Sequence, residues 1–221
     1  MPARVVPDGP GGRAEAIEIL RAGGLIAFPT DTVYGVGVAP TTEDGVARLF
    51  AAKGRPPDRA IVLLLGDPDQ AEAIATLTPA GAALAAAFWP GGLTIVVPRR
   101  RDGAFRLALT TDPTSTQLDT VGLRVPDHPA PRTIARALGA LPTTSANRSG
   151  EAEARDAAEI ESHLGAALDL ILDAGPAPGG PPSTVVDASS ETVRILRRGA
   201  VSAAEIARVL RNAGLPEPVG R

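Results

Sequence analysis

The sequence predicts one domain in which helices pack against a mixed β-sheet, and three observations support this prediction. Short apolar runs bounded by glycine and proline alternate with amphipathic stretches along most of the 221 residues. Their order is irregular, which favours a mixed sheet in an α/β or α+β domain. Hydrophobic residues form 44% of the chain but aromatic residues only 3%, so the core must consist of alanine, leucine, valine and isoleucine. We therefore expect a single domain over residues 1–221, with its core at about 13–213.

Helices are expected where a capping residue or a proline precedes an amphipathic stretch. The first expected helix covers 13–22 and ends at Gly23-Gly24. A capping box at Thr41-x-x-Asp44 is expected to begin the second, which buries Val46, Leu49 and Phe50 and ends at Lys53-Gly54, before Pro56. The remaining helices are expected to begin at Asp67-Pro68, Thr78-Pro79, Thr133, Asp156 and Ser202-x-x-Glu205.

Strands are expected where apolar residues run continuously or alternate. The expected strands cover residues 25–28, 60–65, 93–97, 104–109, 121–125, 168–172, 184–186 and 193–196. The low-complexity stretch "GPAPGGPP", residues 175–182, is interpreted as a loop within the domain, since too few residues follow it for an independent domain. The tail at 215–221 is expected to be disordered.

The composition excludes several classes of function. A formal net charge of −3 argues against a protein that coats nucleic acid by bulk charge, although a local basic patch stays open. The chain has no cysteine, which excludes disulfides, zinc–thiolate sites and cysteine nucleophiles. It has no signal-like start and no apolar run approaching about 18 residues, so we expect a cytoplasmic protein without a membrane segment.

Four stretches carry more polar side chains than turns require: "FPTDTVYGVG" at 28–37, "KGRPPDR" at 53–59, "VGLRVPDH" at 121–128 and "TTSANRSG" at 143–150. Lys53 and Arg55 stand two residues apart after a helix, where they suit a polyphosphate. Arg124 interrupts an apolar strand and suits a carboxylate or phosphate. Ser145 and Asn147 suit ribose and phosphate oxygens. Each stretch also has a structural explanation: a capped loop, a solvated helix end, a solvated strand face or an Asx-rich turn.

Several catalytic patterns are absent. The chain has no G-x-x-x-x-G-K-[ST] motif, and "GPGG" precedes a helix instead of following a strand. The two histidines, His128 and His163, are far apart and lack a serine nucleophile context. Acidic residues show no metal-binding spacing, so we expect no protein-bound metal. A reaction here should rest on positioning and positive charge, without a nucleophile from the protein.

Taken together, these stretches resemble the YrdC/TsaC family, the L-threonylcarbamoyladenylate synthases. The resemblance covers about residues 24–200 and rests on "FPTDTVYGVG", "KGRP", "FWPGGLT", "VGLRVPDHP", "TTSANRSG", "STVVD" and "ILRRGA" in this order. It implies a YrdC-like α/β fold, a twisted mixed sheet flanked by helices with a large, positively charged concave cleft. The implied reaction converts L-threonine, bicarbonate and ATP with Mg²⁺ into threonylcarbamoyl-AMP and pyrophosphate. The implied partner is the tRNA threonylcarbamoyl transferase machinery, with a weak contact to tRNA itself.

The resemblance also implies roles for individual residues. Lys53 and Arg55 would be catalytic and hold the phosphates. Further nucleotide contacts would come from Thr120, Ser145, Asn147 and Arg197. The amino-acid pocket would comprise Thr32, Arg124, Thr143 and Ser183, with Arg124 pairing the threonine carboxylate and Tyr34 packing beside them.

The chain departs from the family pattern at two positions of interest. Leu64 stands where many relatives have a histidine near the amino acid, and Glu153 where many have a serine. The sequence leaves two alternatives: a nucleotide- or RNA-binding module of the same fold without synthase activity, and the carbamoyl-transfer module of hydrogenase maturation. The latter chains are far longer and carry cysteine clusters, which argues against that reading.

Overall fold

A computed structural model of the chain describes residues 2–42, 44–56, 61–100 and 119–219. The helices are α1 (Pro10–Arg21), α2 (Gly45–Lys53), α3 (Pro79–Phe88), α4 (Pro129–Leu138), α5 (Ala157–Leu164) and α6 (Ala203–Asn212). The strands are β1 (Arg4–Pro7), β2 (Ile26–Phe28), β3 (Gly35–Gly37), β4 (Val62–Leu64), β5 (Leu93–Pro98), β6 (Thr120–Arg124), β7 (Leu141–Ser145), β8 (Leu170–Asp173), β9 (Thr184–Asp187) and β10 (Arg194–Arg197). Short 3₁₀ helices cover Pro68–Ala73 and Gly165–Ala167.

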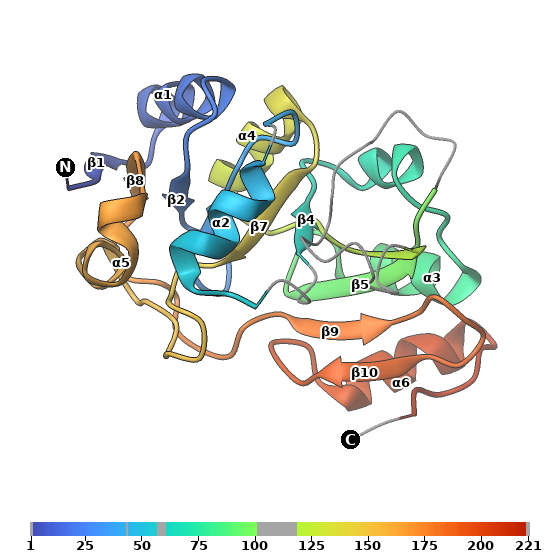
Figure 1. Ribbon diagram of the computed structural model, residues 1–221. Helices are drawn as coiled ribbons and strands as arrows, with labels where there is room; N and C mark the ends of the chain where they lie inside the picture. The colour runs from blue at the N-terminus through green and yellow to red at the C-terminus, as the bar shows by residue number, and fades with distance from the viewer. Residues whose placement is uncertain (1, 43, 57–60, 101–118, 220–221) are drawn as a thin grey trace.

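One mixed sheet contains the ten described strands in the order β1-β8-β2-β3-β7-β4-β6-β5-β9-β10. Its pairing is parallel for β1–β8, β8–β2, β4–β6 and β5–β9, and antiparallel elsewhere. Figure 1 shows helices packed along this sheet, with α1 near β8 and β2, α4 near the central strands β7 and β4, and α6 beside β10 at the far end. The expected mixed sheet is confirmed.

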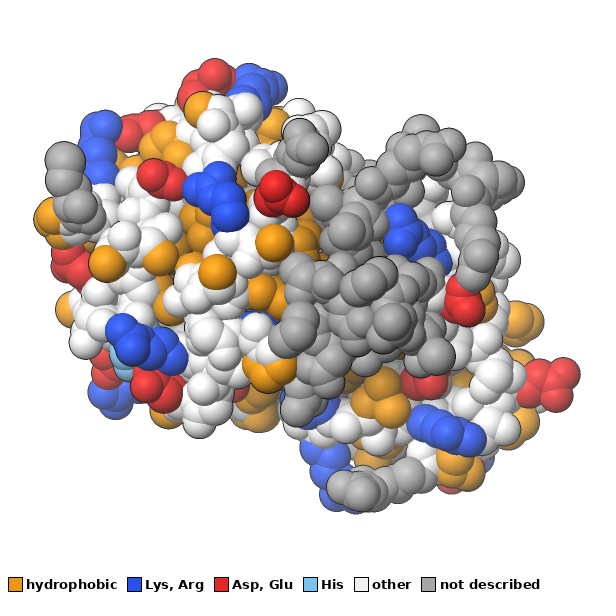
Figure 2. All heavy atoms as spheres, viewed as in Figure 1, with side chains coloured by type: hydrophobic (Ala, Val, Ile, Leu, Met, Phe, Trp, Pro, Cys, Tyr) orange, Lys and Arg blue, Asp and Glu red, His pale blue; other side chains and the backbone are white. Residues whose placement is uncertain are grey.

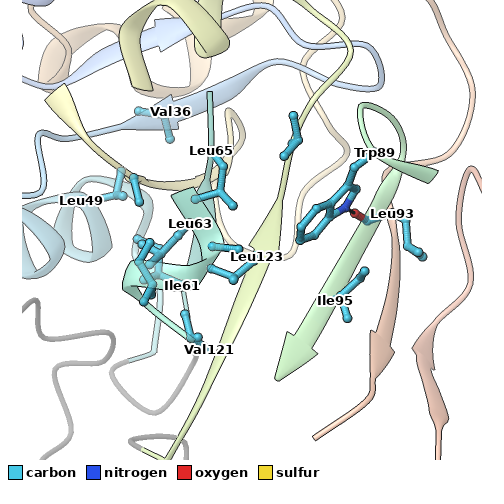
Figure 3. Packing of buried hydrophobic residues seen from close by; sticks show 14 of the residues in the cluster. Val36, Leu49, Ile61, Leu63, Leu65, Trp89, Leu93, Ile95, Val121 and Leu123 are labelled. Carbon is cyan, nitrogen blue, oxygen red and sulfur yellow. Dashed lines mark hydrogen bonds between the residues drawn. The ribbon is translucent and has the colours of Figure 1, made fainter. Parts of the chain in front are cut away.

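Successive strand residues point to opposite faces, and each face has its own core. On one face, Leu64 and Leu141 pack with Leu20 of α1 and Ile134 of α4. On the other, Leu63, Leu123 and their neighbours form the larger core, which Figure 3 shows extending to Trp89 of the α3–β5 turn. Among the described residues, α1 and α4 pack on only part of the first face, and the pocket described below lies near β4, β6 and β5.

Helix ends follow their capping chemistry. Thr78 accepts a hydrogen bond from the Gly81 amide at 3.0 Å and begins α3, as expected. Ser202 and Glu205 form the expected capping box of α6. The capping box expected at Thr41-x-x-Asp44 is wrong, because Asp44 adopts φ 55° and makes no side-chain cap, although α2 ends at Lys53 as expected.

Other expectations differ from the structure in detail. β1, β3 and β7 were not expected from the sequence, and α4 begins at Pro129, four residues earlier than expected, where His128 Nδ1 caps it. The helix expected after Asp67-Pro68 is a 3₁₀ helix. The strand expected at 104–109 lies outside the described residues.

The end of the chain makes specific contacts as far as Val219. Leu215 packs against the larger core. The Val219 amide donates to Val193 O at 2.8 Å, and the Ile195 amide donates to Val219 O at 3.2 Å. Val219 therefore pairs with Arg194 at the outer edge of β10 and satisfies backbone groups that would otherwise be unpaired there. In the described parts of the chain, no helix is long and apolar enough to cross a membrane.

Candidate functional site

A pocket on the partly covered sheet face gathers residues from all four polar stretches. Its wall includes Thr30 and Tyr34 after β2, Arg55 after α2, Arg124 at the end of β6, and Ser145 at the end of β7. Further lining residues are Val33, Gly35, Val62, Leu64, Thr94, Thr143, Thr144, Pro182, Ser183 and Arg197. Three guanidinium groups and several hydroxyls therefore surround one cavity whose floor is partly apolar. Such a lining suits a small ligand that carries negative charge.

Arg124 is the most buried of the three arginines, with 6% of its surface exposed. Its Nη2 donates to Asp31 Oδ1 at 2.6 Å, its Nη1 donates to Thr32 Oγ1 at 3.0 Å, and its Nε donates to Gly91 O at 2.9 Å. Burial lowers the pKa of the guanidinium, and the Asp31 carboxylate opposes this. Since a guanidinium has five N–H groups, donors are left for a ligand carboxylate at a fixed orientation.

Ser183 and Arg197 also line the pocket and bind each other. Arg197 Nη2 donates to Ser183 O at 2.8 Å and to Ser183 Oγ at 3.1 Å. The Ser183 hydroxyl also lies 2.9 Å from Thr94 Oγ1. These contacts join β5, β9 and β10 at the pocket and fix the Ser183 hydroxyl toward β5.

Lys53 lies beneath the pocket and not in its wall. Its ammonium donates to Ser145 O and, at 3.3 Å, to Asn147 Oδ1. Asn147 Oδ1 also accepts from Ser145 Oγ at 2.5 Å, and the Ser149 amide donates to Lys53 O at 2.9 Å. Lys53 therefore holds the segment 145–149 through both its side chain and its backbone.

Lys53 is also the only lysine of the chain, in which every other Lys or Arg position is an arginine. Burial of the ammonium and the nearby Arg55 lower its pKa from 10.5 to about 7, while Glu153 opposes the shift. A guanidinium would resist such a shift, so lysine gives this position a charge that responds to pH near neutrality.

We predict that NMR titration of protein with ¹³C-labelled lysine shows one side-chain resonance with a midpoint near pH 7. The physical reason is that transfer of an ammonium into a buried site disfavours its charged form. Because the label reports one residue, no assignment is needed. A midpoint near 10.5, the ordinary value for lysine, would contradict the buried geometry.

The structure places the remaining predicted residues as follows. Thr143 lines the pocket, but its hydroxyl donates to Leu141 O at 2.9 Å. Thr120 is not in the pocket wall, yet the strand register pairs Gly122 with Val62 and Val62 with Thr143. Two residues further along, Thr120 and Ser145 therefore lie toward the same edge of the sheet. Arg55 lines the pocket, with its guanidinium 5.4 Å from the Phe50 ring centroid.

Both departures from the family pattern lie at this site. Leu64 lines the pocket and also belongs to the core shared with α4. Glu153 interacts electrostatically with Lys53 and Arg197 and raises the pKa of each against the effect of burial. It therefore partly balances the positive charge between these two residues.

Asp31 and Thr94 also belong to the site, but neither was expected there from the sequence. Asp31 stands inside the quoted motif, but its partner Arg124 is 93 residues away, so only the fold reveals the pair. Thr94 begins an apolar strand and carries no local signal of a ligand. No group of three or more His, Asp or Glu side chains that could hold a metal ion occurs within residues 2–42, 44–56, 61–100 and 119–219.

Comparisons with known proteins agree with this architecture. The family model Sua5_yciO_yrdC, described as "Telomere recombination", matches residues 18–199. A Mycobacterium tuberculosis protein named "Putative threonylcarbamoyl-AMP synthase" is 38% identical over 200 residues, which cover 90% of this chain and 89% of the relative. A Chromohalobacter salexigens protein named "Threonylcarbamoyl-AMP synthase" is 39% identical and covers 82% of this chain and 95% of the relative.

Solved structures show the same fold. The crystal structure of Pyrococcus abyssi Sua5 complexed with L-threonine superimposes with a TM-score of 0.81 at 31% sequence identity. The match covers 94% of this chain and 60% of that longer chain. The YrdC-like mixed sheet implied by the sequence resemblance is thus confirmed.

Proposed function

The chain belongs to the Sua5/YciO/YrdC family, and from this premise we propose that it is an L-threonylcarbamoyladenylate synthase. Its substrates are L-threonine, bicarbonate and ATP, and its products are threonylcarbamoyl-AMP and pyrophosphate. In reaction terms it is a nucleotidyltransferase, because the adenylyl group moves from pyrophosphate to a carbamate oxygen. The product serves tRNA modification through a downstream threonylcarbamoyl transferase.

The convergence of Arg55, Arg124 and Arg197 on one pocket is the observation that supports this function best. L-threonine carries a carboxylate and ATP carries phosphates, so the two substrates need separate cations. Arg124 is held by Asp31, whereas Arg197 is held by Ser183, so the two guanidinium groups are positioned independently. A pocket with several independently held cations suits two anionic substrates better than one.

The substrates themselves supply the nucleophile. The threonine amine attacks carbon dioxide derived from bicarbonate and loses a proton, which forms a carbamate. A carbamate oxygen then attacks the α-phosphorus of ATP, and the bond to the β-phosphate oxygen breaks to release pyrophosphate. The protein contributes orientation and charge stabilisation, which is how enzymes accelerate phosphoryl and nucleotidyl transfer.

We assign the residues to two groups. Arg124 pairs the threonine carboxylate, and Thr32, Thr143 and Ser183 complete the amino-acid pocket. Arg55 and Arg197 contact the phosphates and nucleotide together with Thr120, Ser145 and Asn147. Lys53 supports the nucleotide side, since its ammonium holds Ser145 and Asn147.

Mg²⁺ is assigned to the substrate and not to a protein-bound site. It would arrive bound to the phosphates of ATP and neutralise charge that develops on the leaving pyrophosphate. The described residues include no acidic cluster for a separate ion, and the arginines of the pocket suit the remaining phosphate oxygens.

The proposed reaction is tested by incubating the purified protein with ATP, Mg²⁺ and bicarbonate, with and without L-threonine. We expect pyrophosphate release that depends on threonine, with a carbamoyl-adenylate among the products. ATP binding without threonine-dependent release would contradict the proposal and favour the binding-module reading. A steep salt dependence of RNA binding would then distinguish an RNA-binding module from a nucleotide-binding one.

A further inference from the structure

The connection between β8 and β9 crosses most of the sheet. β8 is second and β9 ninth in the strand order, so seven strand spacings of about 4.8 Å, or about 34 Å along the sheet, separate them. Residues 174–183, here called the crossover segment, join Asp173 to Thr184. Fully extended, this length of chain reaches about 36–40 Å. Figure 1 shows this segment as the orange trace between β8 and β9. Sheet curvature shortens this path, and the segment is not fully extended, because Gly175, Gly179 and Gly180 have positive φ.

Both ends of the crossover segment are fixed by hydrogen bonds. At the β9 end, the Ala200 amide donates to Pro182 O at 2.9 Å, and Arg197 donates to Ser183 O at 2.8 Å. This end is also tightly packed, since a Cβ atom at Gly199 would lie 2.2 Å from Pro182 O. Pro182 and Ser183 line the pocket, so the position of this end shapes the pocket wall.

At the β8 end, the Gly175 amide donates to Asp173 Oδ1 at 2.8 Å. The second fixed point is the side chain of Tyr34. Its hydroxyl donates to Gly175 O at 2.6 Å and accepts from the Ala174 amide at 3.0 Å. The Tyr34 ring is 1% exposed, and Tyr34 O accepts from the Ala146 amide at 2.8 Å. One residue thus joins the strand end that carries Thr32, the segment that carries Ser145 and Asn147, and the crossover segment.

Between these ends the crossover segment is exposed and has few contacts. The Ala177 amide donates to Arg155 O at 2.6 Å and assists Tyr34 at the β8 end. Beyond it, Pro178–Pro181 is exposed, and Gly179 and Gly180 have φ of 79° and 107°. Pro178 and Pro181 restrict the backbone on either side of these two glycines, so the position of the β8 end limits where the β9 end can lie.

We propose that Tyr34 is a positioning residue for threonine binding. Its hydroxyl holds the start of the crossover segment in place, and this in turn fixes the positions of Pro182 and Ser183 in the pocket wall. The expected effect on threonine binding rests on the proposed function. The hydrogen bonds between the Tyr34 hydroxyl and the crossover segment do not depend on which reaction the protein catalyses. Tyr34 does not touch the reacting atoms in this role.

Tyr34→Phe removes only the hydroxyl and its two hydrogen bonds. We expect the KM for threonine to rise about three- to tenfold, with a smaller change in the KM for ATP and in kcat. Amide hydrogen exchange in peptides covering 174–184 should become faster. Thr78→Val is a matched control, because Thr78 Oγ1 also donates once, to Ala188 O, and accepts once, from the Gly81 amide, outside the pocket.

A second variant tests the segment without touching the core. Insertion of two glycines between Gly179 and Gly180 adds about 7 Å of slack in an exposed stretch. We expect it to raise the KM for threonine at least as much as Tyr34→Phe. If the insertion leaves this KM unchanged, or if Tyr34→Phe alters exchange and KM no more than Thr78→Val does, the proposal is overturned.

The two proposals fail in different ways. If the natural protein shows no threonine-dependent release of pyrophosphate, the proposed function is wrong, and hydrogen exchange then decides the positioning role alone. Faster exchange over 174–184 in Tyr34→Phe, absent in Thr78→Val, would still support this role. Equal exchange in both variants would exclude it.

Discussion

Replacement of Arg124 by alanine is expected to raise the KM for threonine about ten- to a hundredfold, while the KM for ATP changes much less. The reason is the loss of charge-assisted hydrogen bonds to the substrate carboxylate, each of which contributes about 1.5–3 kcal/mol. The measurement is the rate of pyrophosphate release as a function of threonine at saturating ATP. An unchanged threonine dependence would contradict the assignment of Arg124.

Arg132→Ala is the matched control for this variant. Arg132 Nε donates to Gly66 O at 2.9 Å and its Nη2 donates to Asp67 Oδ1 at 3.0 Å, a pattern close to that of Arg124 with Gly91 and Asp31. It lies on α4, outside the pocket wall. Arg132→Ala should therefore lose comparable structural bonds without changing the KM for threonine.

The double variant Arg124→Ala/Asp31→Asn separates binding from stability. Arg124→Ala leaves the half-buried Asp31 carboxylate without its ion-pair partner, which lowers the stability of the fold. Removing the charge of Asp31 should recover part of this stability, seen as a higher midpoint in urea. Threonine affinity should not recover, because the cation is still missing.

The sequence was most informative where local chemistry decides the structure, although the capping box at Thr41 and the His128 cap of α4 were exceptions. Thr78 and Ser202 precede their helices with the hydroxyls that cap them, and the structure uses both. Continuous apolar runs likewise marked β4, β5 and β6. These signals depend on residues within four positions of one another, so they can be seen without the fold.

Elements decided by distant partners were not predicted. β3 is Gly-Val-Gly and has no strand-like composition. It forms because Gly35 pairs with Ser145 and fits beneath a neighbour, where a Cβ atom would lie 3.0 Å from the Thr143 methyl and 3.1 Å from the Phe28 ring. Only the folded neighbours explain why glycine is needed there.

At the site, too, local features could be predicted from the sequence and features that depend on the fold could not. The motifs identified which residues carry charge, but not which atoms face the ligand. Lys53 and Arg55 are two residues apart and were expected to face the same phosphates. Because Lys53 is the last residue of α2 and Arg55 follows the left-handed Gly54, the two side chains diverge, and only Arg55 lines the pocket.

Lys53→Met is expected to lower kcat/KM for ATP about ten- to a hundredfold, because Ser145 and Asn147 lose the charged donor that holds them. The same substitution should change how stability depends on pH. Since the pKa of Lys53 is about 7 in the folded protein and 10.5 ordinarily, the unfolded chain binds more protons between these values. The natural protein therefore gains stability as pH rises from 7 toward 10.5, by at most about 1.4 kcal/mol per pH unit from this group.

Lys53→Met lacks this gain. Between pH 7 and pH 9, the unfolding free energy of the natural protein should therefore rise relative to that of Lys53→Met. Urea titrations at both pH values measure it, and groups common to both proteins cancel in the comparison. Arg48→Met removes an exposed cation from the same helix and should alter neither ATP use nor the pH slope. Parallel slopes for the natural protein and Lys53→Met would show that the Lys53 ammonium is not penalised by burial. If the slopes differ as expected, burial of the Lys53 ammonium lowers the stability of the protein, and this cost is greatest below pH 7. The one lysine of the chain then holds the nucleotide side of the pocket at the expense of stability.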